Sequence, residues 1–242
     1  MTVTRPRAER GAFPPGTEHY GRSLLGAPLI WFPAPAASRE SGLILAGTHG
    51  DENSSVVTLS CALRTLTPSL RRHHVVLCVN PDGCQLGLRA NANGVDLNRN
   101  FPAANWKEGE TVYRWNSAAE ERDVVLLTGD KPGSEPETQA LCQLIHRIQP
   151  AWVVSFHDPL ACIEDPRHSE LGEWLSQAFE LPLVTSGGYE TPGSFGSWCA
   201  DLNLHCITAE FPPISSDEAS EKYLFAMANL LRWHPKDAIR PS

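Results

Sequence analysis

The chain has 242 residues, of which 41% are hydrophobic and 20% charged, and its formal net charge is −8. This composition is typical of a globular protein, and the negative balance argues against a basic nucleic-acid surface. The longest apolar runs are too short to cross a bilayer, which needs about 20 residues. We therefore expect neither nucleic acid nor a membrane among the partners.

The N-terminus carries basic residues without an apolar stretch behind them, so we expect no secretory signal and a cytoplasmic location. From residue 42 onward, strand-like and helix-like segments alternate. A hairpin is predicted over 20–34, turning near Leu25 and Gly26. Short apolar runs predict strands, and apolar residues at three- and four-residue spacing predict helices. Ser134 is the expected N-cap of the helix predicted over 134–148. The predicted strands are 43–47, 74–80, 151–157, 181–185 and 204–211, and the predicted helices are 52–66, 134–148, 168–180 and 217–233.

This alternation predicts an α/β fold with a central mixed, mostly parallel twisted sheet flanked by helices on both faces. Segment 81–118 has little periodicity and predicts a long loop, which in a compact domain is usually functional. No linker divides the chain. We expect one catalytic domain over 20–236, with an N-terminal extension at 1–19 and a C-terminal tail at 237–242.

The seven cysteines are odd in number and form no Cys-x-x-Cys motif. Most lie in apolar segments such as VVLCV. We interpret them as reduced, small core residues rather than as a disulfide framework.

The stretch GTHGDENSS, residues 47–55, places His49 and Glu52 just after a predicted strand. Another predicted strand ends in His157, and ligands of open α/β sheets bind beyond the carboxyl ends of the strands. A catalytic zinc takes three protein ligands, and two histidines with one glutamate are a known set. Taken singly, these residues also fit a capped helix with an exposed histidine and a partly buried histidine. Together they predict a zinc site.

Glu210 ends a further apolar strand, where a carboxylate is costly to bury unless it is paired or functional. Beside a zinc-activated water it would act as general base and then as general acid, whereas an ion pair at the sheet edge is the alternative. The long loop carries Arg89 and the Asn98-Arg99 pair. Arginine binds carboxylates with two hydrogen bonds and stabilises oxyanions, although each of these arginines alone fits a solvated surface charge.

The ordered set of motifs resembles the zinc metallocarboxypeptidase family over roughly residues 20–235. It comprises His49-x-x-Glu52, NPDG (80–83), Arg89, GVDLNRNF (94–101), SEPET (134–138), His157 and Glu210. The chain resembles most closely a bacterial branch that hydrolyses the γ-D-glutamyl–meso-diaminopimelate amide of the murein tripeptide. The resemblance implies a carboxypeptidase-like fold, one zinc ion per subunit, a small muropeptide substrate and a role in cell-wall recycling. A homodimer is the default expectation for such an enzyme.

The resemblance also implies a role for each matching residue. His49, Glu52 and His157 would bind zinc, and Glu210 would be the general base and acid. Arg89 would stabilise the oxyanion.

The resemblance assigns the remaining positions to substrate binding. Asn98 and Arg99 would bind the terminal carboxylate of the substrate. Tyr189 lies where the digestive members carry a mobile tyrosine that caps the substrate, and a plain loop tyrosine is the alternative. Asp158 follows the third metal ligand, where digestive members often carry serine, so it would orient the site or meet a substrate amino group.

Two other functions remain open from the sequence. A deacylase of the aspartoacylase or succinylglutamate desuccinylase type shares the His-Gly-x-Glu start and the Asp-x-Asn-Arg segment, whereas NPDG and SEPET favour a peptidase. A non-catalytic module that binds muropeptides would normally have lost a ligand or the base. All four of those positions are filled in this chain.

Overall fold

A six-stranded sheet forms the centre of the structure, a computed structural model that describes residues 16–115, 119–188 and 190–235. Four neighbouring strands are parallel, the fifth is antiparallel to the fourth, and the sixth is parallel to the fifth. The fold is therefore the predicted mixed, mostly parallel sheet. In order across the sheet, the strands are β4 (His74–Val76), β3 (Leu43–Leu45), β7 (Trp152–His157), β10 (His205–Glu210), β8 (Cys162–Glu164) and β9 (Leu183–Val184).

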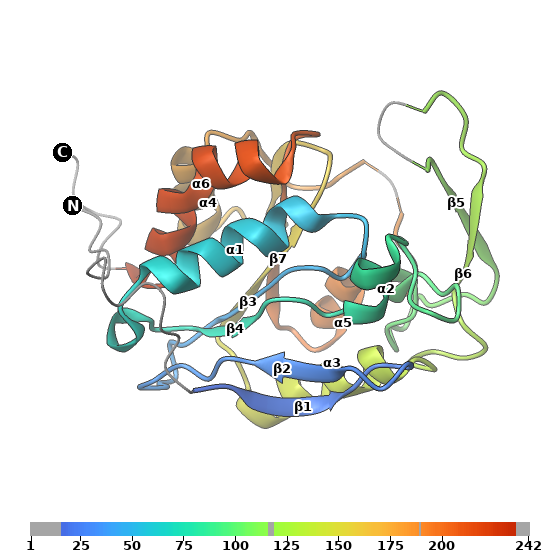
Figure 1. The fold of residues 1–242 in the computed structure, drawn as a ribbon, viewed down its shortest axis with the longest axis horizontal. Coiled ribbons are helices and arrows are strands. Elements are labelled where there is room, and N and C mark those ends of the chain that lie inside the picture. The colour runs from blue at the N-terminus through green and yellow to red at the C-terminus, as the bar shows by residue number, and fades with distance from the viewer. Residues whose placement is uncertain (1–15, 116–118, 189, 236–242) are drawn as a thin grey trace.

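Helices cover both faces of this sheet (Figure 1). One face packs against α1 (Asn53–Thr65), α4 (Glu170–Phe179) and α6 (Ser216–Leu230), and the other packs against α3 (Pro136–Ile148) and α5 (Phe195–Asp201). The N-terminal hairpin of β1 (Glu18–Arg22) and β2 (Pro28–Trp31) lies beside α3. Coverage of both faces explains why the inner strands are mostly apolar, and every residue of β7 is buried.

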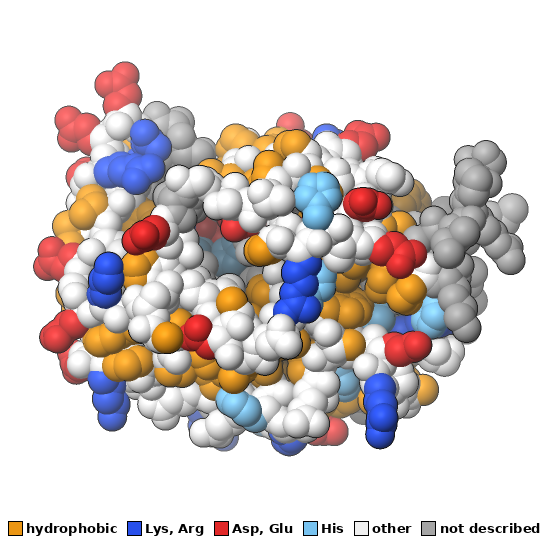
Figure 2. All heavy atoms as spheres, turned by 180° about the vertical axis from the view of Figure 1, so that it is seen from behind, with side chains coloured by type: hydrophobic (Ala, Val, Ile, Leu, Met, Phe, Trp, Pro, Cys, Tyr) orange, Lys and Arg blue, Asp and Glu red, His pale blue; other side chains and the backbone are white. Residues whose placement is uncertain are grey.

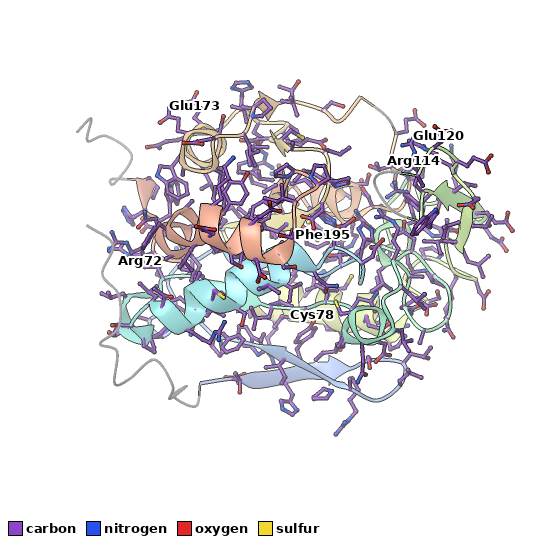
Figure 3. The ribbon with its side chains drawn as sticks, turned by 45° about the horizontal axis from the view of Figure 1, so that its top comes forward. Arg72, Cys78, Arg114, Glu120, Glu173 and Phe195 are labelled. Carbon is purple, nitrogen blue, oxygen red and sulfur yellow. The ribbon has the colours of Figure 1, made fainter. Side chains whose placement is uncertain are left out.

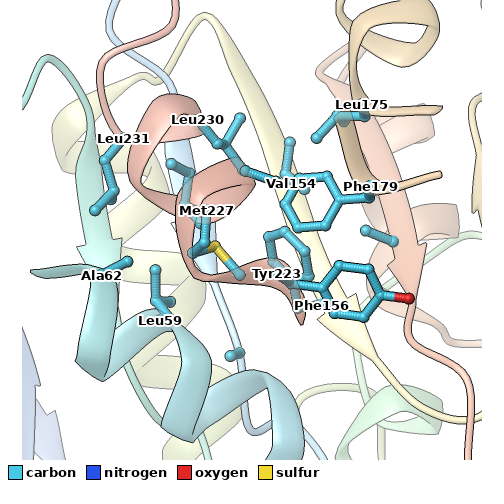
Figure 4. Packing of buried hydrophobic residues seen from close by; sticks show 14 of the residues in the cluster. Leu59, Ala62, Val154, Phe156, Leu175, Phe179, Tyr223, Met227, Leu230 and Leu231 are labelled. Carbon is cyan, nitrogen blue, oxygen red and sulfur yellow. The ribbon is translucent and has the colours of Figure 1, made fainter. Parts of the chain in front are cut away.

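The larger core cluster lies between the sheet and the layer formed by α1, α4 and α6 (Figure 4). Leu59 of α1 and Met227 of α6 are fully buried there, next to Val154 and Phe156 of β7. Burying one such side chain stabilises the fold by about 1.5–3 kcal/mol. This packing fixes α1, and therefore the turn that precedes it, against the sheet.

All the predicted strands, helices and the N-terminal hairpin are present, with shifts of a few residues at their ends. The prediction of Ser134 as N-cap was wrong by one residue. Helix α3 begins at Pro136 with Glu135 at its N-cap, and the Ser134 hydroxyl instead donates to Glu135 Oε1 at 2.7 Å. The proline at the first helical position has no N–H to satisfy, which suits that site.

The prediction of an irregular loop over 81–118 was only partly correct. That segment contains α2 (Pro81–Leu86), the 3-10 helix η3 (Leu97–Arg99) and β5 (Glu110–Tyr113). Helix α2 is too short to show periodicity, and it is set locally because the Asn80 side chain accepts a hydrogen bond from Gly83 N–H at 2.9 Å.

Other elements were also missed by the sequence reading. Strand β5 pairs with β6 (Val124–Leu127) in an arm that projects from the body (Figure 1). The short elements β8, α5 and the 3-10 helix η2 (Pro68–Leu70) were not predicted either.

The helices, the cysteines and the surface cavity each test a further expectation from the sequence. Among the described residues, no helix combines the length and apolarity that a membrane span requires. None of the seven cysteines forms a disulfide, as predicted. Cys162 and Cys199 are buried in the core, and Cys142 and Cys206 pack against it, whereas Cys61, Cys78 and Cys84 are partly exposed. A cavity of about 460 Å³ lies between the end of α1 and the N-terminal hairpin, and its lining includes Leu66 and Arg71 but none of the predicted site residues.

Candidate metal centre and active site

The β3–α1 turn, residues 46–52, carries His49 and Glu52, two of the predicted metal ligands. The turn lies directly against α2. A Cβ atom at Gly50 would lie only 2.1 Å from the carbonyl carbon of Gly83. Only glycine fits this approach, so packing against α2 explains the second glycine of the GTHGDE motif.

The third predicted ligand and the predicted base come from neighbouring strands. His157 is the last residue of β7, and Glu210 is the last residue of β10. The two strands are parallel, and their register places Glu210 directly beside His157. Since β3 is parallel to β7 on its other side, the turn after β3 opens at the same edge of the sheet.

The three predicted ligands converge at this edge. Glu52 Oε1 lies 2.8 Å from His49 Nδ1, and Glu52 Oε2 lies 2.9 Å from His157 Nδ1. The two Nδ1 atoms are 3.2 Å apart. All three side chains are buried, and they provide one ligand atom each within a 4.8 Å span. Three donor atoms this close together fit a single small cation.

Hydrogen bonds on the outer side of the two histidines hold their rings in place. His49 Nε2 lies 3.1 Å from Asp96 Oδ1, and His157 Nε2 lies 2.9 Å from Ser155 Oγ. Both rings therefore have a partner at Nε2 and turn Nδ1 toward Glu52. Orientation of this kind is typical of metal-binding histidines.

The charges around the cluster favour a cation. Burial and the charge of Arg89 lower the pKa of His49, but Glu52 and Asp96 outweigh them and raise it to about 9. Burial raises the pKa of Glu52, but the charges of His49, Arg89 and His157 hold it well below its usual range. The carboxylates therefore favour binding of positive charge at this buried site. Two imidazoles and one carboxylate are a donor set that suits zinc.

Glu210 has the environment of a proton-transfer group. Its side chain is buried, and burial raises its pKa to about 7, an effect that His157 opposes and Glu52 reinforces. The backbone N–H of Leu160 donates to Glu210 Oε2 at 3.4 Å. A carboxyl group that titrates near neutral pH can both accept and return a proton.

Arg89 reaches the three candidate ligands from the loop after α2. Its Nη1 donates to Glu52 Oε1 at 2.7 Å, and its guanidinium lies 4.0 Å from the ring centroid of Tyr113. Burial lowers the pKa of Arg89, but the carboxylates of Glu52 and Asp96 raise it further, so the group keeps its charge. The structure thus brings Arg89 into the site, where it is hydrogen-bonded to Glu52, a predicted ligand.

Asn98 and Arg99 lie in η3, on the same side of the sheet as α5. Asn98 Oδ1 accepts a hydrogen bond from Phe195 N–H at 2.9 Å, which ties η3 to the start of α5. Arg99 is buried, and its Nη1 donates to the Asn98 carbonyl oxygen at 2.7 Å. Figure 3 labels Phe195, the first residue of α5, near the middle of the molecule.

Asp158 lies on the opposite side, beside the start of α1. Its Oδ2 accepts a hydrogen bond from Ser54 Oγ at 2.7 Å, whereas its Oδ1 is buried without a partner among the described residues. Burial raises the pKa of Asp158 to about 7, Ser54 lowers it, and Glu52 raises it. The remaining predicted residue, Tyr189, lies outside the described residues.

Four residues that hold the site together were not predicted from the sequence. They are Ser54, Asp96, Tyr113 and Ser155. Asp96 lies inside the GVDLNRNF motif, and a buried acid between Val95 and Leu97 was a signal that could have identified it. Tyr113 donates to Asp96 Oδ2 at 2.5 Å from the β5–β6 arm, and no local pattern marks that contact.

The space-filling view shows a hollow on this face of the molecule, in which histidine and acidic side chains lie below the surrounding surface (Figure 2). A small substrate could therefore reach polar, metal-capable groups from outside.

Comparisons with known proteins agree with this geometry. The family model for zinc carboxypeptidases matches residues 16–159. The chain is 99% identical to murein peptide amidase A of Escherichia coli strain K12 over the full length of both, and 56% identical to that of Vibrio campbellii over 95% of this chain and 93% of the other.

Two solved structures extend the comparison. A crystal structure of murein-tripeptide amidase from Escherichia coli O157 superposes with a TM-score of 0.95 at 99% identity, covering 98% of this chain and 100% of that one. Bovine thrombin-activatable fibrinolysis inhibitor, in complex with a tick carboxypeptidase inhibitor, superposes with a TM-score of 0.69 at 20% identity, covering 92% and 90%. The second likeness shows a shared fold.

Proposed function

Because the chain belongs to the zinc carboxypeptidase family, we propose that it is a zinc-dependent amidase that hydrolyses the γ-D-glutamyl–meso-diaminopimelate bond of the murein tripeptide. One observation carries this proposal. Three buried ligands converge at the sheet edge with Glu210 beside them, in a chain that is 99% identical to a murein peptide amidase along its whole length.

His49, Glu52 and His157 hold one zinc ion per subunit in this proposal. When bound, the ion would supply Lewis acidity for attack of water on the scissile carbonyl. Glu210 accepts the proton of the attacking water and then delivers it to the leaving nitrogen of diaminopimelate. A pKa near 7 supports both steps, because the group changes protonation state with little cost at neutral pH.

The arginines stabilise the negative charges of the substrate and of the reaction. Arg89 stabilises the oxyanion that develops on the scissile carbonyl, and its raised pKa and closeness to the ligand cluster support this role. Arg99 and Asn98 bind the free carboxylate of the leaving amino acid. A substrate extended at that carboxylate should therefore not be cleaved.

Asp158 binds a different part of the substrate from the two arginines. Asp158 has a carboxylate with no cationic partner among the described residues, which supports contact with a substrate amino group. Tyr189 caps the bound peptide. Catalysis belongs to the single domain over 20–236, and the enzyme acts in the cytoplasm, in muropeptide recycling, as a homodimer.

The test is turnover of L-Ala-γ-D-Glu-meso-diaminopimelate by purified, zinc-loaded protein, followed by chromatography of the released diaminopimelate. We expect release that stops with a chelator and returns with zinc. Acetylaspartate, succinylglutamate and a tetrapeptide extended by D-alanine should remain intact.

Each failure in this assay has a separate meaning. Hydrolysis of the acyl amino acids instead of the tripeptide would replace the proposal with a deacylase. Tight binding of the tripeptide without turnover, at full zinc content, would identify a binding module.

A further inference from the structure

Two cysteine thiols, those of Cys78 and Cys84, lie in contact with each other next to the β3–α1 turn. Cys78 follows β4, and Cys84 lies within α2. Their Sγ atoms are 3.2 Å apart, and both residues are partly exposed. Cys78 is labelled in Figure 3, close to α1 and α2. The pair therefore joins the end of a core strand to a helix at the active site.

Both cysteines pack against the turn that carries the metal ligands. A Cβ atom at Gly47 would lie 3.1 Å from Cys78 Sγ, and one at Gly50 would lie 2.4 Å from the backbone nitrogen of Cys84. These two glycines flank His49 in sequence. The two cysteines are therefore in close contact with the backbone on both sides of His49.

We propose that Cys78 and Cys84 are a site of reversible oxidation by hydrogen peroxide, and that their disulfide lowers amidase turnover by displacing the β3–α1 turn. Formation of the disulfide stands on the thiol geometry alone. The effect on turnover rests on the proposed function.

The chemistry needs only the two thiols and the peroxide. The Cys84 thiolate attacks one peroxide oxygen, the O–O bond breaks, and a sulfenic acid and water form. The Cys78 sulfur then attacks the sulfur of the sulfenic acid, which releases a second water as the S–S bond forms. Two thiols lose two electrons and two protons, and one hydrogen peroxide becomes two waters.

The surroundings favour Cys84 as the attacking group. The hydrogen bond from the Cys78 thiol lowers the pKa of Cys84, against the opposing effects of burial, Asp51 and Glu52. The same bond raises the pKa of Cys78, which keeps its proton. A thiol with a lowered pKa beside one with a raised pKa is the pairing that favours sulfenic acid formation at the first and its resolution by the second.

The geometry gives the movement that the disulfide requires of the two sulfurs. A disulfide bond is about 2.05 Å long, so the two sulfurs must approach by about 1.1 Å. Helix α2 and the β3–α1 turn have no free space between them at Gly50. A displacement of about 1 Å at a catalytic group can lower the rate by about 100-fold.

The experiment compares reduced and peroxide-treated full-length, zinc-loaded protein. Peptide mapping of alkylated, unreduced samples should find a Cys78–Cys84 crosslink. Oxidised protein should lose at least tenfold in kcat/KM on the tripeptide and release zinc to a chelator at least tenfold faster. A thiol reductant should restore both.

Matched variants assign the effect to this pair. Cys84→Ser should keep its activity in peroxide, and Cys78→Ser serves the same purpose if the first variant folds poorly by thermal denaturation. Cys61→Ser is the control, because Cys61 is a partly exposed thiol of α1 whose sulfur contacts Arg64 Nη2 at 2.9 Å. It should respond to peroxide as the wild type does.

Two results would overturn the proposal. One is oxidation of Cys61 at a peroxide dose that leaves the pair unlinked. The other is full crosslinking with unchanged turnover and unchanged zinc release. A reduced protein that fails to cleave the tripeptide, yet crosslinks and then loses zinc faster, would refute the proposed function and leave the oxidation site standing.

Discussion

Replacing Gly50 by alanine should damage the active site more than the fold. The new Cβ would lie 2.1 Å from the Gly83 carbonyl carbon and 2.4 Å from Leu88 O, whereas ordinary contacts of a Cβ begin at 3.4 Å. The β3–α1 turn and α2 must therefore separate by about 1.3 Å, the difference between 3.4 and 2.1 Å. A shift of that size beside His49 should lower kcat/KM by about 100-fold and weaken zinc binding.

The same shift has a bounded effect on stability. Overpacking costs typically 1–3 kcal/mol, so we expect a free-energy loss of about 2 kcal/mol. In a chain of this size, that lowers Tm by roughly 4–8 °C. Gly196→Ala is the control, since the nearest atom to its Cβ would be 3.9 Å away and alanine favours a helix.

The assay combines tripeptide turnover, zinc content and thermal unfolding of Gly50→Ala and Gly196→Ala beside the wild type. The control should match the wild type in turnover. Wild-type turnover and zinc content in Gly50→Ala would refute the reasoning, because they would mean that the turn can move away from α2 without moving its ligands.

Three further outcomes are expected. Glu210→Gln should keep its zinc and substrate binding but lose about 1,000-fold in kcat, and an active variant would exclude Glu210 as the base. His157→Ala should lose zinc by elemental analysis, whereas the exposed His146→Ala should retain it; equal metal content would remove His157 from the ligand set. Burial lowers the pKa of His73 in the folded protein to about 4, whereas the pKa of a histidine in the unfolded chain is about 6.5. As the pH falls, this imidazole is therefore protonated in the unfolded chain before it is protonated in the folded protein. The stability from this neutral histidine is complete above pH ~6.5 and decreases toward pH ~4. Between pH 7.5 and pH 5, the wild type should therefore lose about 2 kcal/mol more of its unfolding free energy in urea than His73→Gln does, a difference that cancels other titrating groups such as His74.

The sequence was sufficient for the fold class and for the residues at the strand ends. Apolar runs with turn residues define the strands, and parallel strands align their carboxyl ends at one edge. His157 and Glu210 each end such a run, and His49 follows one. Their convergence could be predicted because each position follows from local pattern, and the structure brings all three to one place together with Glu52.

Only the tertiary structure decided which groups surround that centre. The bond from Arg89 to Glu52, the support of His49 by Asp96, and the contact between Cys78 and Cys84 join segments without any shared periodicity. Such contacts depend on strand register and on the packing of short elements such as α2. The position of α2 is in turn fixed by a side-chain hydrogen bond at its start and by close contact with the β3–α1 turn, and neither produces a pattern in the sequence. Local pattern therefore predicts the candidate ligands, and long-range packing determines their environment.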